Sequence, residues 1–291
     1  MAKELTHILI AQDVLKKLKG SGQLLLAQVI ERNLPAFYLG AIIPDAFFYD
    51  VPPFPLSPQK YIWISRNLHL REKAQNDQVA VSFFGSIAAN PCAWRLKVAF
   101  AAGVITHTVS DRILHEVIDY YTTTWGQKDS LAVATHRQIE TLIDMVLVQQ
   151  LHLHPRDFYL ERLIHLERRP LNCLFRFYLA HLGVHLASGP WHLNALKRAL
   201  VKQCLFLKLF TQRALYHTIK VSNKLAADRL RTWFSLFYPD HIGPQTFPIL
   251  DKIDLNALTD GHAFTGTVTS IKDAAIADAI RHINIGLKRF A

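Results

Sequence analysis

Apolar residues recur every three or four positions along most of the chain, which is the spacing of one face of an α-helix. The pattern predicts helices over about 5–18, 23–32, 36–44, 77–89, 94–121, 129–151, 156–168, 171–187, 191–203 and 270–287, and an amphipathic run that continues to residue 237. Prolines and glycines predict loops at 50–58 and 239–248. No alternating strand pattern of any length and no internal repeat occurs. The sequence therefore predicts an all-α protein.

Length and composition indicate a globular protein with a substantial core. The chain has 291 residues, of which 50% are hydrophobic and 19% are charged. We expect a first helical domain at residues 1–150 and a helical extension at residues 151–291 that packs on it. No uncharged run is typical of a membrane span.

The positive charge is concentrated in the second half. The net charge is +10, and residues 151–240 alone hold 14 Lys and Arg against 5 Asp and Glu, among many aromatic residues. Such a region could face a membrane surface, a nucleic acid or an acidic partner. The alternative, which we favour, is that the aromatic side chains are core and the cations form a solvated face. No nucleic-acid-binding motif accompanies the charge, so nucleic acid is the weaker expectation.

The sequence indicates a cytoplasmic protein. Its first residues, Met-Ala-Lys-Glu-Leu-Thr-His, are charged where a signal peptide has an apolar core. Its three cysteines, Cys92, Cys173 and Cys204, are widely separated and fit reduced thiols.

Three polar residues lie in an apolar stretch of the helix predicted at 94–121. His107, Asp111 and His115 are four residues apart, so they form one stripe on one helix face. A buried carboxylate without a partner is very costly. The stripe must therefore either hydrogen-bond internally or bind something charged, such as a metal ion.

Other residues of the first half could join this stripe in one site. They are His7, Asp45, His69, His136 and Glu140. Imidazole and carboxylate without thiolate suit zinc in a hydrolytic site. Each residue taken alone has a plainer interpretation: a lone histidine is more often a satisfied core or surface residue, and His136 with Glu140 could be an exposed helix pair. His181 and His185, also four apart, have no accompanying carboxylate, and we interpret them as structural.

The order and spacing of these residues resemble the zinc-dependent phospholipase C family, the all-helical one. The catalytic domain of glycosylphosphatidylinositol phospholipase D is a relative, and the P1/S1-type nucleases share the fold more distantly. The resemblance spans residues 5–145 and rests on Thr6-His7, Gly40-Ala-Ile-Ile-Pro44-Asp45, His69, Gly103-Val-Ile-Thr-His107-Thr-Val-Ser-Asp111-Arg-Ile-Leu-His115 and His136-Arg-Gln-Ile-Glu140. It implies a multi-helix bundle of the phospholipase C/P1 nuclease type, here with additional C-terminal helices.

The resemblance also implies a ligand set. His115, His136 and Glu140 would hold one zinc; Asp45, His69, His107 and Asp111 would hold a second; His7 would serve a third, bridged by Asp111. Asp45 would orient or deprotonate the attacking water. In secreted members an N-terminal Trp completes the third site, and no Trp precedes His7, so we expect between one and three ions.

The leading hypothesis is a zinc-dependent hydrolase that cleaves a phospholipid or another phosphodiester, and peripheral contact with a membrane surface is left open. A P1/S1-type nuclease is the first alternative, mildly favoured by the basic region. A non-catalytic metal-binding scaffold is the second. Comparing turnover of phosphatidylcholine and single-stranded DNA would separate the first two.

Overall fold

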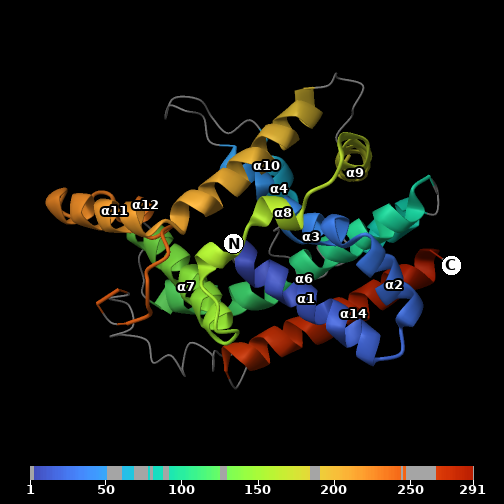
Figure 1. Ribbon diagram of the computed structural model, residues 1–291, viewed down its shortest axis with the longest axis horizontal. Coiled ribbons are helices and arrows are strands. Elements are labelled where there is room, and N and C mark those ends of the chain that lie inside the picture. Colours follow the sequence, from blue (N-terminus) through green and yellow to red (C-terminus); the bar gives the residue numbers. More distant parts are fainter. Residues whose placement is uncertain are drawn as a thin grey trace. The chain divides into compact units, whose positions relative to one another are not determined.

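The computed structural model describes residues 3–50, 61–68, 78, 81–87, 92–124, 130–183, 191–243, 245–246 and 267–290. Every regular element among these residues is a helix, and Figure 1 shows coiled ribbons without arrows. The prediction of an all-α protein is therefore confirmed. None of the helices in these ranges combines the length and apolarity needed to span a bilayer.

The helices follow the chain in a simple order. They are α1 (Glu4–Gly20), α2 (Leu24–Arg32), α3 (Leu34–Ile42), the 3₁₀-helix η1 (Ile43–Tyr49), α4 (Ile62–Leu68), α6 (Trp94–Thr124), α7 (Ser130–Gln149), the 3₁₀-helix η2 (Pro155–Asp157), α8 (Leu160–Leu163), α9 (Arg168–His181), α10 (Trp191–Phe210), α11 (Arg213–Leu225), α12 (Arg231–Phe234) and α14 (Val268–Phe290). Residues 81–87 are also helical.

The structure corrects the predicted helix at 156–168. Pro155 opens a short 3₁₀ turn whose ends are capped: the Asp157 carboxylate accepts from the His154 backbone N–H at 2.7 Å, and His154 Nδ1 accepts from the Arg156 N–H at 3.2 Å. These bonds cap the start of the turn, and the helix does not continue because Phe158, directly after Asp157, has an extended backbone (φ −94°, ψ +110°). The segment therefore holds only η2 and the four-residue α8 before α9 begins.

The amphipathic run towards residue 237 is also interrupted. Ala227 and Asp228 have φ values of +47° and +63°, in the left-handed region that a right-handed helix cannot contain. These two residues separate α11 from α12, and the break between α10 and α11 falls at Gln212, whose backbone is extended (φ −78°, ψ +118°).

Contacts divide the chain into two compact units, each assembled from three segments. Unit 1 comprises Met1–Thr6, Ile113–Tyr159 and Phe206–Ala274; unit 2 comprises His7–Arg112, Leu160–Leu205 and Ala275–Ala291. The division into domains at 1–150 and 151–291 stays a prediction.

In unit 2, two glycines bring α3 and α6 into backbone contact. A Cβ atom added to Gly40 would lie 2.1 Å from the Phe100 carbonyl oxygen, and one added to Gly103 would lie 2.1 Å from the Phe37 carbonyl oxygen. Phe37 and Phe100 are fully buried beside this crossing, each contributing about 1.5–3 kcal/mol by burial. The close approach fixes the distance between α3 and the part of α6 that belongs to unit 2.

An ion-pair cluster in unit 2 fixes the end of η1. The Asp50 carboxylate accepts from Arg198 Nε at 3.0 Å and Nη2 at 2.9 Å, and from Lys202 Nζ at 3.2 Å. Burial alone would raise the pKa of Asp50, but the two cations of α10 outweigh it and hold the pKa below its usual range. Asp50 directly follows η1, so this cluster anchors the 3₁₀-helix that contains Asp45.

Unit 1 has its own buried polar anchor. The Asp144 carboxylate of α7 accepts from the Thr6 backbone N–H at 2.9 Å, from the Thr6 hydroxyl and from the Tyr238 hydroxyl. Three donors compensate much of the cost of burying the carboxyl group. The anchor ties the start of α1 to α7, immediately before His7 in the chain.

The basic second half contains both core and surface aromatic residues. Phe210 and Tyr216 are buried, whereas the Trp233 side chain is 53% exposed. The cations Arg213 and Lys220 are exposed, as a solvated helix face requires. Contact of this region with a membrane surface stays a prediction.

The crossing of α3 and α6 gives a stability prediction. Gly40→Ala places a methyl group on the backbone of α6, and the helices must separate, so the free energy of unfolding should fall by about 1–3 kcal/mol despite the better helix propensity of Ala. The matched control is Gly85→Ala, whose added Cβ meets no atom within 4 Å; it should be neutral or gain up to about 1 kcal/mol. Urea unfolding measures both. Equal stability of the two variants would contradict the account of the crossing.

Candidate metal centre

Helix α6 contains the His107, Asp111 and His115 stripe as one continuous helix of 31 residues. His107 and Asp111 are buried, and His115 is partly exposed. The boundary between the units falls between Arg112 and Ile113. His107 and Asp111 therefore belong to a group in unit 2, and His115 belongs to a group in unit 1.

The unit 2 group consists of His7, Asp45 and His107, all buried. Each offers a ligand atom within 4.8 Å of the others. His107 Nε2 lies 3.7 Å from Asp45 Oδ1, and the His7 and His107 rings stack with centroids 4.0 Å apart. Asp111 lies beside them, with its Oδ1 3.9 Å from His7 Nε2.

Hydrogen bonds that Nδ1 donates set the tautomers of both histidines. His107 Nδ1 donates to the Ala41 carbonyl oxygen at 2.8 Å. The Ser110 hydroxyl donates to the His107 carbonyl at 3.0 Å, so it accepts from His7 Nδ1, which lies 3.0 Å away. In the neutral rings both protons are therefore on Nδ1, and each Nε2 has a lone pair. This is the arrangement of metal-binding histidines, which donate their other ring N–H to a backbone or hydroxyl oxygen.

The separations in this group fit zinc. A nitrogen and an oxygen bound to one tetrahedral zinc at 2.0–2.2 Å lie about 3.3–3.6 Å apart. The observed 3.7 and 3.9 Å are too long for hydrogen bonds and slightly longer than that range. Small side-chain movements would bring these atoms to coordination distance.

The unit 1 group consists of His115 on α6 and of His136 and Glu140 on α7. His136 and Glu140 are one turn apart, and His136 Nε2 lies 3.1 Å from Glu140 Oε1. The His115 and His136 ring centroids are 5.1 Å apart. Two imidazoles and one carboxylate make the three-ligand set that a catalytic zinc uses when its fourth position is open.

Glu140 gives the unit 1 group a negative charge. Burial alone would raise the pKa of Glu140, but nearby positive charge, including that of His136 and His115, and the His136 hydrogen bond lower the pKa to about 2. Glu140 is therefore ionised at neutral pH. A metal that took the place of the His136 Nε2 proton would bind an anionic site and release that proton.

The two groups differ in access to solvent. The side chains of His115 and His136 are 22% and 24% exposed. The members of the unit 2 group are buried. The unit 1 imidazoles are therefore partly accessible to solvent, and the unit 2 imidazoles are not.

The structure brings together seven of the eight predicted ligands in two places. His7, Asp45, His107 and Asp111 meet in unit 2, and the remaining three meet in unit 1. His69 lies outside the described residues. Asp45 directly follows the helix predicted at 36–44; in the structure it is a buried residue of η1, because the chain continues as a 3₁₀-helix through Pro44.

Two further polar residues were missed by the sequence analysis. Asp119 Oδ1 lies 3.9 Å from His115 Nδ1 and 4.0 Å from His136 Nδ1. It is four residues after His115, so the same spacing that gave the stripe could have found it. Ser110 left no comparable signal, because a serine inside an apolar helix has many roles.

Tyr178 of α9 is the third residue that the sequence analysis passed over. It is fully buried in unit 2, and its hydroxyl oxygen has no hydrogen-bond partner among the described residues. Burial, and to a lesser extent the negative charge of Asp45, raise the pKa of its phenol well above the usual range. It therefore keeps its proton as a donor near Asp45. In the sequence it is one aromatic residue among several in a core-like run.

Comparison with protein families identifies the family of the chain. The family model described as zinc dependent phospholipase C matches residues 6–183. The chain belongs to the zinc-dependent phospholipase C family. The match covers both metal groups and continues through α9 to include Tyr178, beyond the predicted range of 5–145. Searches of curated proteins and of solved structures found no match.

Membership of the zinc-dependent phospholipase C family leads to a prediction for metal content. Protein purified without added metal should contain zinc, and His136→Ala should lose about one ion per chain, because the unit 1 group keeps only two of its three ligands. His165→Ala, at an exposed histidine outside both groups, is the control. Elemental analysis by mass spectrometry gives the stoichiometry. Unchanged zinc in His136→Ala would show that the metal binds elsewhere.

Proposed function

We propose that this family member is a hydrolase that cleaves the phosphodiester bond of phospholipids with zinc bound at both groups. The observation that supports it most strongly is that the segment matching the family contains two separate groups, each made of imidazoles and a carboxylate. The family is zinc dependent, and its name implies a phospholipid substrate. The positions of the ions and the roles of the residues are the proposal.

Each group would hold its metal with preset ligands. In unit 2 the ligands would be His7, Asp45 and His107, with Asp111 beside His7; in unit 1 they would be His115, His136 and Glu140. Zinc supplies Lewis acidity, which polarises a phosphoryl oxygen and lowers the pKa of water. The Nδ1 hydrogen bonds of His7 and His107 hold their rings in one orientation, so the side chains would lose little conformational entropy when the metal binds.

Asp45 is the residue that we propose as the general base. Its carboxylate belongs to the unit 2 group, and η1 is held by the Asp50 cluster at its far end. A carboxylate that accepts the proton of the attacking water typically contributes about 10²–10⁴-fold to the rate.

Asp45→Asn tests this role. The amide keeps the size and an oxygen ligand but cannot accept a proton, so phosphatidylcholine hydrolysis should fall by about 10²–10⁴-fold while zinc content stays the same. Asp273→Asn, at an exposed carboxylate outside both groups, should keep full activity. Release of the phosphorylated headgroup is the readout, with single-stranded DNA assayed in parallel.

Three results would contradict the proposal in different ways. Hydrolysis of single-stranded DNA but not of phosphatidylcholine would favour the nuclease alternative. Zinc-loaded protein that cleaves neither substrate would favour the scaffold. Full activity of Asp45→Asn would remove Asp45 from the role of base and leave the rest of the proposal standing.

A further inference from the structure

Helix α11 exposes an apolar stripe on the side opposite its packed face. Tyr216 and Asn223 are its buried residues. Four other positions, spaced by four, three and four residues, share one face because a helix turns about once every 3.6 residues. Leu225 is 83% exposed and Val221 is 58% exposed. All four positions are exposed, and they are Ala214, Thr218, Val221 and Leu225.

The one polar group of this stripe is satisfied within the helix. The Thr218 hydroxyl donates to the Ala214 carbonyl at 2.9 Å. The stripe as a whole is therefore apolar, although it does not pack on the core of unit 1.

A basic stripe runs beside the apolar one. Each of its members directly precedes a member of the apolar stripe, so it lies about 100° away round the helix. The members are all exposed, and they are Arg213, His217, Lys220 and Lys224. Asp240 Oδ2 lies 2.8 Å from Arg213 Nε and 3.6 Å from His217 Nε2, at the start of the helix. The two lysines continue the stripe towards Leu225.

Helix α12 adds to both features. It contacts α11, and Figure 1 shows the two helices next to each other in orange. Its Trp233 side chain is 53% exposed. From Arg213 to Phe234 the chain contains five Lys and Arg against one Asp. The two helices therefore present apolar side chains together with a net positive charge.

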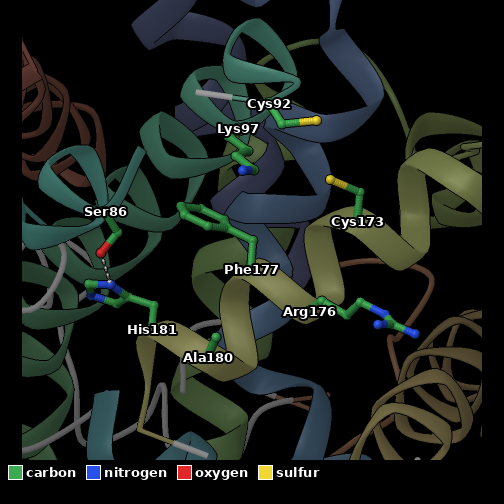
Figure 2. Close-up of a pocket in the computed structure, with 8 residues that line it drawn as sticks. All are labelled: Ser86, Cys92, Lys97, Cys173, Arg176, Phe177, Ala180 and His181. Atoms are coloured by element: carbon green, nitrogen blue, oxygen red, sulfur yellow. Dashed lines mark hydrogen bonds between the residues drawn. The ribbon is translucent and has the colours of Figure 1, made fainter. Parts of the chain in front are cut away.

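Helix α9 shows that a basic amphipathic helix does not need such a stripe. It also exposes arginines, among them Arg169 and Arg176, but none of its large apolar side chains is exposed. Figure 2 shows its Phe177 ring directed towards Lys97, both of which line a cavity in unit 2. One apolar face packed on a core is enough for a surface helix. The second, exposed stripe of α11 therefore indicates a partner outside the chain.

We propose that α11 and α12 form the surface with which the protein binds an anionic lipid bilayer. The apolar stripe and Trp233 enter the layer between headgroups and acyl chains, where tryptophan is enriched in membrane proteins. Lys220 and Lys224 extend their apolar stems along this layer and place their ammonium groups among the headgroup phosphates. A second copy of the chain fits the surface less well, because it would bring two basic stripes together.

The proposed surface goes beyond the proposed function. The family match ends at residue 183, and α11 begins at Arg213. The two metal groups contain residues of neither α11 nor α12. Binding to a bilayer can therefore be tested without hydrolysis.

Vesicles without a phosphodiester separate the two. Digalactosyldiacylglycerol forms a neutral bilayer, and phosphatidic acid, a phosphomonoester, makes it anionic. The full-length, metal-containing protein should cosediment with vesicles that contain phosphatidic acid, and salt should weaken this binding because it screens surface charge. Without phosphatidic acid the affinity should be about tenfold lower or less still.

Val221→Ser combined with Leu225→Ser tests the apolar stripe. Both residues are exposed, so the variant should fold, and its affinity for anionic vesicles should fall roughly tenfold or more because apolar area no longer enters the bilayer. The matched control is Leu24→Ser combined with Leu25→Ser on α2. It removes two apolar side chains that are 57% and 82% exposed, and it should bind like the wild type.

Lys220→Gln combined with Lys224→Gln tests the basic stripe. A lysine near an anionic surface contributes about fivefold to the affinity, so the double variant should bind roughly 25-fold more weakly. Arg169→Gln combined with Arg176→Gln removes the same net charge from α9 and should bind nearly like the wild type.

Several results would overturn the proposal. No binding to the anionic vesicles, or equal binding with and without phosphatidic acid, would exclude an anionic bilayer as the partner. Wild-type binding by either α11 variant would show that the bilayer contact lies elsewhere. A wild-type dimer that becomes a monomer in Val221→Ser with Leu225→Ser would show that a second copy covers the stripe.

A soluble substrate keeps this test apart from that of the proposed function. Dispersed short-chain phosphatidylcholine needs no bilayer, so both α11 variants should hydrolyse it like the wild type. Failure of vesicle binding with this hydrolysis intact would overturn only the bilayer surface. Vesicle binding without any hydrolysis would overturn only the proposed function.

Discussion

The backbone contact between α3 and α6 is the constraint on which the unit 2 group depends. Gly40 and Gly103 approach so closely that neither position has room for a Cβ atom. The residue after Gly40, Ala41, offers its carbonyl to His107, which is one turn after Gly103. Asp45 follows on η1, directly after α3. Two residues without side chains thus set the distance between a carboxylate and an imidazole that are far apart in the chain.

A four-residue spacing organises the polar interior on both long helices. On α6 it gives His107, Asp111 and His115, and it continues to Asp119. On α7 it gives His136 and Glu140, and then the buried Asp144, which binds the start of α1 instead of a histidine. The same spacing therefore yields candidate ligands and a structural anchor. Neighbouring donors and charges, not the spacing, distinguish these roles.

The sequence predicted the long helices well, because their apolar faces are continuous. Helices α6 and α7 begin and end close to the predicted positions. The short elements were missed, because η2 and α8 depend on capping contacts and the break after α11 depends on left-handed residues. The spacing of apolar residues gives no signal for capping contacts or for left-handed residues. Candidate ligands on one helix could be grouped from their spacing, but the meeting of His7, Asp45 and His107 depends on tertiary packing. Only the family resemblance predicted that these residues share a site, and the resemblance predicted neither Asp119 nor Tyr178.

The structure contains polar side chains that an apolar core does not tolerate without compensation. In unit 2 the Nδ1 atoms of two stacked imidazoles are hydrogen-bonded, and their Nε2 lone pairs face carboxylates across gaps of 3.7 and 3.9 Å. In unit 1 an ionised glutamate lies beside two imidazoles. A divalent cation at each place would compensate both arrangements in the same way. We therefore expect a divalent cation at each group.

Anomalous diffraction from crystals of the protein, recorded on both sides of the zinc absorption edge, tests that claim most directly. We expect one peak bounded by His7, Asp45 and His107 and another bounded by His115, His136 and Glu140, each about 2.0–2.2 Å from its ligand atoms. No zinc peak at either group, with His136 still hydrogen-bonded to Glu140, would contradict it.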